Sequence, residues 1–344
     1  MGGDMGEHVV EVHEECVDPV GWDHVVDRSG APLFYRSDVL RSYRRHPLQE
    51  TLDQYYLTVR RRRTGAVEAV LPLFRLPAAD PLGVIGSVLP SFREGGDPVL
   101  LSHVWHWYDT RLPALSADPA LVDAVCQAVE SLAAECGVQA FGFINVLEDS
   151  ELATLLGKTR LRGVCADARY TVDLMAFRTA EDYITGLPRG PRQDLRRQLR
   201  RAQAAGARTA VETEPDEATL RDVASLCRAT AAKHGNPGWY QPARLTGFVH
   251  GVEAGLRLLT VRIAGRLVAA SISFTDGTVF HNWTAGSLPP ARLSFSPYAV
   301  LFHASLRAAL DEGCELLEGG RRNDDWKTRL GMTRRPLSCW LAGT

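Results

Sequence analysis

The sequence predicts a mixed α/β (α+β) fold in two halves, and three observations support it. An amphipathic helix over residues 119–136 is followed by a buried strand over 140–146. The second half contains three antiparallel strands, a helix and a further strand: 256–264, 266–274, 278–284, 297–312 and 314–318. Helices and strands thus follow one another in both halves, which favours sheets covered by helices over an all-α or all-β fold. The shared order also suggests an ancient duplication.

Turn residues separate the strands of each half. In the second half, Ala264-Gly265 and Asp276-Gly277 stand between apolar runs, and such pairs supply the positive φ angles of tight hairpins. In the first half, strands over 55–60 and 66–74 are expected to form a hairpin. Residues 75–112 are rich in Gly, Pro and aromatic residues and are expected to be a long loop.

We therefore expect three segments. Residues 1–15 are predicted to be a flexible polar tail, residues 16–168 an N-terminal domain, and residues 169–344 a C-terminal domain that carries the chemistry. The chain has 344 residues, a length that fits two domains of ordinary size.

The bulk composition restricts the classes of partner. The formal net charge is −2, so any site for a polyanion such as tRNA must be a local basic patch, and no DNA partner is expected. No apolar run approaches the ~20 residues of a membrane helix, and the acidic N-terminus lacks the apolar core of a signal peptide. These features predict a cytoplasmic protein without a membrane partner.

The cysteines and histidines do not predict a metal site. The seven cysteines include no Cys-x-x-Cys pair, and reduced, mostly buried thiols are expected. His103, Trp105, His106, Trp107 and Tyr108 form a tight cluster in the sequence. No carboxylates accompany them at metal-ligand spacing, so they are expected to form an aromatic wall of a cleft between the two domains.

One motif in the second half carries residues typical of a reactive site. The predicted strand ending at Glu318 runs into Gly319-Gly320, and a Trp326-Lys327 pair and a Leu330-Gly331 pair follow. Lysine is rare here, since only Lys158, Lys233 and Lys327 are lysine among 39 basic residues.

This motif resembles the loop of the Fem family of non-ribosomal peptidyl transferases, which belong to the GNAT superfamily of acyltransferases. The resemblance implies tandem GNAT-like halves, with Lys327 stabilising the oxyanion that forms when an amine attacks an aminoacyl ester. A fixed ammonium beside developing negative charge suits that role. The alternative is a loop lysine paired with Asp324 or Asp325.

A basic helix over residues 191–206 adds to the resemblance, because Fem-like proteins carry a similar helix at this place. Arginines on this helix and just before it repeat at helical spacing and are expected to bind tRNA or another phosphate group: Arg189, Arg192, Arg196, Arg197 and Arg200. Like charges on one helix face repel, and a polyanion partner would offset that cost. The alternative is a solvated face.

Further residues are candidates for the acyl-transfer pocket. We expect Lys327, Trp326 and His281 to act in catalysis. The expected substrate-binding residues are Trp283, Tyr298, Tyr240, Asp325 and Asn323. His281 and Trp283 alternate with Asn282 on one predicted strand and should share a face. Tyr240 is expected on a mobile substrate flap, and His303 is a further candidate for lining the acyl pocket.

The leading functional hypothesis is amide formation by transfer of an amino acid from aminoacyl-tRNA to a small-molecule or peptide amine. The tRNA is then a co-substrate, and no bound cofactor or metal is expected. An acyl-CoA-dependent N-acyltransferase is the alternative, although residues 291–296 lack the usual phosphate-binding loop of that class. A non-catalytic tRNA- or peptide-binding module is the alternative of another class. Residues that bind a peptidoglycan precursor in classical Fem proteins have no match here.

Overall fold

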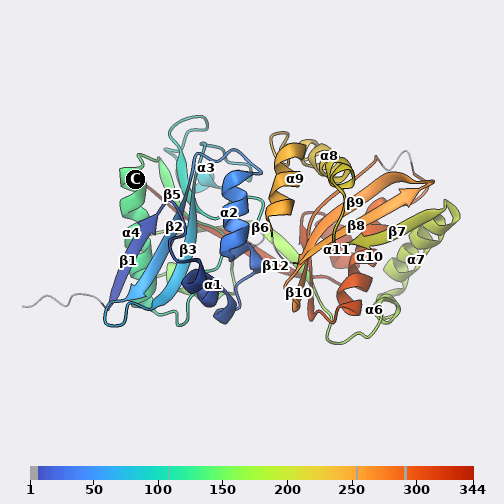
Figure 1. Ribbon diagram of the computed structural model, residues 1–344, viewed down its shortest axis with the longest axis horizontal. Helices are drawn as coiled ribbons and strands as arrows, with labels where there is room; N and C mark the ends of the chain where they lie inside the picture. Colours follow the sequence, from blue (N-terminus) through green and yellow to red (C-terminus); the bar gives the residue numbers. More distant parts are fainter. Residues whose placement is uncertain (1–6, 108, 253–254, 290–292) are drawn as a thin grey trace, which may run out of the picture. The chain divides into compact units, whose positions relative to one another are not determined.

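The computed structural model describes residues 7–107, 109–252, 255–289 and 293–344 (Figure 1). They divide into two compact units. The first unit holds residues up to Arg45, Glu50–Asp167 and Pro336–Thr344. The second unit holds His46–Gln49 and Ala168–Arg335. The sequence placed one boundary at 168/169 and did not predict that the last strand of the chain belongs to the first unit.

The first unit is a six-stranded sheet with helices on both faces. Its elements are β1 (His8–His13), α1 (Pro19–Arg28), the 3-10 helix η1 (Leu33–Tyr35), α2 (Ser37–Arg45), β2 (Asp53–Arg61), β3 (Val67–Leu76), α3 (Ile85–Val88), β4 (Val99–Ser102), α4 (Pro119–Glu135), β5 (Ala140–Leu147), α5 (Glu151–Leu156) and β12 (Thr333–Gly343). The strand order is β1-β2-β3-β4-β5-β12, and only β4 and β5 are parallel.

The second unit has the same arrangement. Its elements are the part of β6 (Arg162–Asp173) from Ala168 on, α6 (Ala180–Gly186), α7 (Arg189–Ala204), β7 (Ala207–Glu212), α8 (Glu217–Lys233), α9 (Pro242–Gly251), β8 (Leu256–Ile263), β9 (Arg266–Thr275), β10 (Val279–Ser287), α10 (Pro297–Asp311), β11 (Leu316–Arg321) and α11 (Asp324–Arg329). The order is β7-β8-β9-β10-β11-β6, and only β10 and β11 are parallel. In each unit a helix, α4 or α10, connects the parallel pair, as parallel strands require.

The predicted mixed α/β fold in two related halves is therefore confirmed. The meander is formed by β8, β9 and β10, and Ala264, Gly265 and Gly277 have the positive φ angles that its turns need. Helix α10 follows it, as predicted.

Two local predictions were wrong. Residues 8–13 are not part of a tail but form β1, which pairs with β2 in full register from His8↔Arg61 to His13↔Tyr56. The predicted loop 75–112 contains α3 and the four-residue strand β4. Both errors concern short segments whose order depends on a partner strand far along the chain, and such segments carry weak periodicity.

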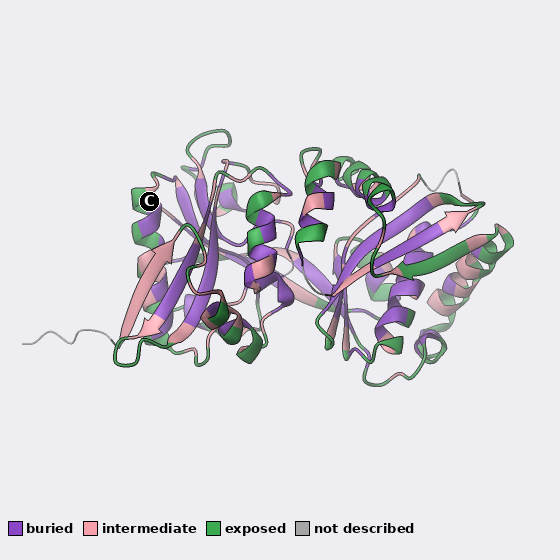
Figure 2. Cartoon of the chain, in the orientation of Figure 1, coloured by how far each residue is buried: buried purple, intermediate pink, exposed green. Residues whose placement is uncertain are grey.

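Each unit has its own hydrophobic core (Figure 2). In the first unit α4 and α5 pack on one face of the sheet, and in the second unit α6, α7 and α10 do so. No helix within the described part of the chain is both long and apolar enough to span a bilayer.

Candidate active site

The site begins where β10 and β11 stop pairing. In the described residues these strands share only three register pairs, which end at His281↔Glu318, although β10 continues to Ser287 and β11 to Arg321. At the same level β10 shifts register against β9, and β11 shifts register against β6. The strands therefore part here, and the edge of β10 beyond His281 can pair with an extended ligand arm.

A tight turn over residues 320–323 ends β11, and three of its residues have left-handed φ angles. Gly320, Arg322 and Asn323 have φ angles of 73°, 63° and 58°. Left-handed φ is rare for residues that carry a Cβ, and such residues gather at functional sites. The amide nitrogen of Gly320 donates to Glu318 Oε1 over 2.9 Å, which holds the start of the turn.

Lys327 lies just after this turn and is fully buried. Its Nζ donates to the carbonyl oxygen of Arg321 over 2.6 Å and lies 5.2 Å from the centre of the Tyr170 ring. The sequence placed Lys327 in a loop, but it belongs to helix α11, where Asp324 and Asp325 occupy the first turn and favour helix formation. A buried ammonium held by a carbonyl is a strong, fixed hydrogen-bond donor.

Trp326 packs beside Lys327 against helix α10. Its ring centre is 4.7 Å from that of Tyr298 and 5.6 Å from that of Phe302. Burial raises the pKa of Tyr298 to about 12, although a hydrogen bond with Asn323 opposes the shift. Asn323 and Asp325 are themselves exposed. The structure thus brings three of the predicted substrate residues around α11.

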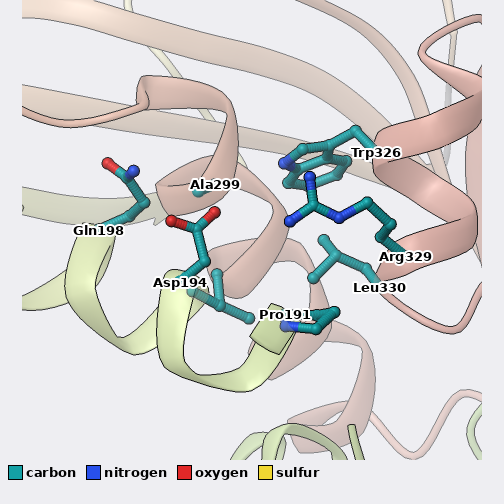
Figure 3. Close-up of a pocket in the computed structure, with 8 residues that line it drawn as sticks. Pro191, Asp194, Gln198, Ala299, Trp326, Arg329 and Leu330 are labelled. Carbon is teal, nitrogen blue, oxygen red and sulfur yellow. The ribbon is translucent and has the colours of Figure 1, made fainter. Parts of the chain in front are cut away.

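A small recess of about 10 Å³ opens next to Trp326 (Figure 3). Its lining comes from three helices and the residue after α11: Pro191, Asp194, Leu195, Gln198, Ala299, Trp326, Arg329 and Leu330. The carboxylate of Asp194 and the guanidinium of Arg329 point into it from opposite sides. At this volume the recess has room for about one water molecule.

His281 and Trp283 lie on the strand that borders the opening. Both are buried, and His281 Nε2 is 3.5 Å from Asp276 Oδ2. Burial by itself would raise the pKa of Asp276, but hydrogen bonds from His281 and from the backbone lower it overall. Phe274 is the register partner of His281 and also lies 5.6 Å from Trp283, so the two residues share a face as the sequence predicted.

Tyr240 is next to Trp283 but is not part of an exposed flap. It is buried, its φ is 55°, and its amide nitrogen donates to the carbonyl oxygen of Leu48. The two ring centres are 5.8 Å apart. Tyr240 therefore packs against Trp283 of β10 as part of the buried core.

His303 lies on α10, and burial lowers its pKa.

The arginines of α7 divide into two groups. Arg192 donates to the carbonyl oxygen of Thr185 over 2.7 Å, and Arg196 forms an ion pair with Glu181, so both are tied back to α6. Arg197 pairs with Asp194. Arg189 and Arg200 are exposed. None of these five arginines is among the residues that line the recess in Figure 3, which faces Asp194 and Gln198 of the same helix.

The predicted aromatic wall belongs instead to the core of the first unit. His103, Trp105 and Trp107 are buried; His103 lies 4.9 Å from the Tyr35 ring centre, and Trp107 lies 4.5 Å from that of Phe34. Burial lowers the pKa of His103 to about 3, so its imidazole is neutral. His106 is stacked on Trp107, while Tyr108 lies outside the described residues.

Sequence reasoning missed Arg169, Tyr170 and Glu318 as members of the site. Arg169 Nη2 and Glu318 Oε2 form a buried ion pair of 2.5 Å. A glutamate inside the otherwise apolar strand ahead of Gly319-Gly320 was the available signal, because charged residues are seldom fully buried without a partner. In the part of the chain that the structure describes, no three His, Cys, Asp or Glu side chains are grouped so that they could hold a metal ion.

Residues 189–328 match the family model of the acetyltransferase (GNAT) domain. No match was found among curated protein sequences.

Three solved structures share the fold over nearly the whole chain. FemX superposes with a TM-score of 0.62 at 10% identity, covering 95% of this chain and 96% of FemX. A tandem GNAT protein from the clavulanic acid biosynthesis pathway gives 0.58 at 15% identity, covering 97% and 98%. L-PGS from Bacillus licheniformis gives 0.58 at 12% identity, covering 95% and 92%. At these identities the likeness concerns the fold.

Proposed function

We propose that this chain is an N-acyltransferase, that its donor is aminoacyl-tRNA and that it makes an amide bond; the match of residues 189–328 to a GNAT domain and the likeness in fold to FemX support this. The acceptor is the amine of a small molecule or a peptide. The nitrogen–carbon bond forms as the ester bond to the tRNA ribose breaks, and the ribose oxygen leaves as a hydroxyl.

The observation that carries the proposal is the buried ammonium of Lys327, held 2.6 Å from the carbonyl oxygen of Arg321 at the end of β11. An aminoacyl ester is already activated, so catalysis needs a positioned amine, a proton acceptor and an oxyanion donor. Lys327 supplies the oxyanion donor, and Trp326 packs to hold α11 in place.

His281 is the proposed proton acceptor, because it lies at the last pair of β10 and β11 and Asp276 contacts its Nε2. Imidazole is the side chain best suited to take a proton near neutral pH. The substrate would be bordered by Trp283 and Tyr240 on the β10 side and by Tyr298, Asn323 and Asp325 around α11.

Donor recognition is assigned to α7. Among its exposed arginines, Arg189 and Arg200 offer charge to a phosphate backbone, while Arg192, Arg196 and Arg197 would have to exchange their internal partners for phosphate. The likeness to FemX agrees with the family resemblance of both α7 and the Trp326-Lys327 pair. A tRNA substrate would place the protein in the cytoplasm.

Acyl-CoA is the alternative donor. The specific observation in its favour is the likeness to a tandem GNAT protein whose structure is described as being without acetyl-CoA. The open edge of β10 would suit the amide-containing arm of CoA equally well.

A single-turnover assay separates the two donors. Purified protein is mixed with a pool of amines and either tRNA charged with radiolabelled amino acids or labelled acetyl-CoA. Amide product from charged tRNA alone, abolished by prior nuclease treatment, is the expected result. Product from acetyl-CoA alone would reject the proposed donor, and product from neither with tRNA bound would favour a binding module.

A further inference from the structure

The pair formed by Arg169 and Glu318 lies at the foot of the strand opening, and the proposed chemistry leaves it without a role. The two side chains are 5% and 0% exposed, and Glu318 stands in the last register pair of β10 and β11. Removing two charges from water is costly, so a buried ion pair adds little net stability. Stability alone is thus a weak reason for the pair.

Glu318 controls the start of the turn that leads to α11. One carboxylate oxygen is paired with Arg169 Nη2, and the other accepts the amide hydrogen of Gly320. Gly320, Arg322 and Asn323 have left-handed φ, which surrounding contacts must hold in place.

Lys327 is bonded to the far end of the same turn. Its amide nitrogen donates to the carbonyl oxygen of Asn323, and its Nζ donates to the carbonyl oxygen of Arg321. The direction of the ammonium therefore depends on the conformation of residues 320–323. A loosened turn would move the Arg321 carbonyl and with it the ammonium.

We propose that Glu318, oriented by Arg169, is a positioning residue for Lys327. Glu318 fixes the turn through the Gly320 amide, and the turn aims the ammonium at the oxyanion. This inference rests on the proposed role of Lys327. Neither Glu318 nor Arg169 contacts the reacting atoms.

Two double variants test the proposal, each without a stranded buried charge. Arg169→Met with Glu318→Gln removes the ion pair but keeps an acceptor for the Gly320 amide. Arg169→Met with Glu318→Leu removes both. Single-turnover amide formation and KM are measured for each, alone and combined with Lys327→Ala.

The variant with Glu318→Gln is expected to lower kcat less than the variant with Glu318→Leu, because the glutamine side chain still accepts the Gly320 amide. The leucine pair is expected to lower kcat by about 10- to 100-fold with KM unchanged, because a misplaced catalytic group costs rate rather than binding. In the Lys327→Ala background the two double variants are expected to have the same kcat, since a residue that acts only through Lys327 has nothing left to position.

Several outcomes would overturn the proposal. Equal kcat values for the two pairs, a raised KM as the only effect, or an undiminished difference in the Lys327→Ala background would each do so. If Lys327→Ala alone retains full turnover, the proposed function of Lys327 fails first, and this is a separate result.

A second comparison covers the case in which the leucine pair does not fold. Gly320→Asn tolerates left-handed φ better than Gly320→Ala does. The alanine variant is expected to lose more of kcat than the asparagine variant, and equal losses would count against the turn as the link to Lys327.

Discussion

In the second unit β10 and β11 stop pairing after His281 and Glu318, whereas in the first unit the chain itself occupies the corresponding place. There the last pair of β4 and β5 is Ser102↔Phe143. Beyond it, the amide nitrogen of Thr110 donates to the carbonyl oxygen of Asn145 over 2.8 Å, and Thr110 forms a parallel bridge with Val146.

The same strand order thus yields an open edge in one unit and a filled one in the other. In the first unit the side chain of Asn145 donates to the carbonyl oxygen of Val104, and the aromatic cluster around His103 and Trp107 packs beside this segment. In the second unit the equivalent level carries the charged residues Glu318 and Lys327. A shared topology therefore does not imply two active sites, because function depends on the residues at the site.

The largest expected effect concerns Lys327. Lys327→Ala should lower kcat by about 10²–10³ with little change in donor affinity, since an oxyanion contact exists mainly in the transition state. Single-turnover rates at saturating donor measure it. Lys158→Ala, which removes an exposed lysine of the first unit, is the matched control and should have no effect. Wild-type turnover in Lys327→Ala would end the assignment of chemistry to the second unit.

The next effect concerns the basic helix of the second unit. Arg189→Glu with Arg200→Glu should weaken tRNA binding and reduce its dependence on salt by about two in the slope of log affinity against log salt. Filter binding across a salt series measures this slope. Arg221→Glu with Arg228→Glu makes the same charge change at exposed positions of α8 and should leave the slope intact. If both double variants have the same slope, the arginines of α7 form only a solvated face and do not bind tRNA.

A third prediction concerns pH and the filled site of the first unit. Burial depresses the pKa of His103, although Asp109 and the backbone of Phe34 oppose the shift. The unfolded chain takes up a proton below pH about 6.5 while the folded chain does not, so stability falls as pH decreases, by about 1.4 kcal/mol per pH unit.

Urea unfolding between about pH 6.5 and pH 5 checks this prediction, within the range below the usual His pKa. His103→Asn, which tolerates the left-handed φ of this position, should lack that part of the slope. Carboxylates titrate in both proteins, so they cancel in the difference. Identical slopes would mean that His103 is protonated in the folded state.

The last prediction concerns the number of donor molecules that bind to one chain. Because Thr110 already pairs with β5, one donor analogue is expected to bind per chain, in the second unit. Calorimetry with a non-hydrolysable aminoacyl-tRNA analogue gives the number directly. A value of two per chain would show that the segment around Thr110 can leave the first unit's sheet.

Some parts of the site could be predicted from the sequence and others could not. The meander and α10 were predictable because Ala264-Gly265 and Asp276-Gly277 encode their turns locally and helix periodicity encodes α10. Trp326 and Lys327 were found because their motif is short and contiguous. Arg169 was not found, because it meets Glu318 only through the pairing of β6 with β11, and these strands are far apart in the sequence.

The sequence by itself determined the elements whose signals are local: amphipathic helices such as α4, the tight turns of the meander, and the Trp326-Lys327 pair. Tertiary structure alone decided how β6 and β12 are divided between the units, where β10 and β11 part, and that Thr110 fills the equivalent place in the first unit. Strand pairing joins residues that no sequence window holds together. The register of such pairs is set by packing over the whole sheet, so only the folded chain fixes it.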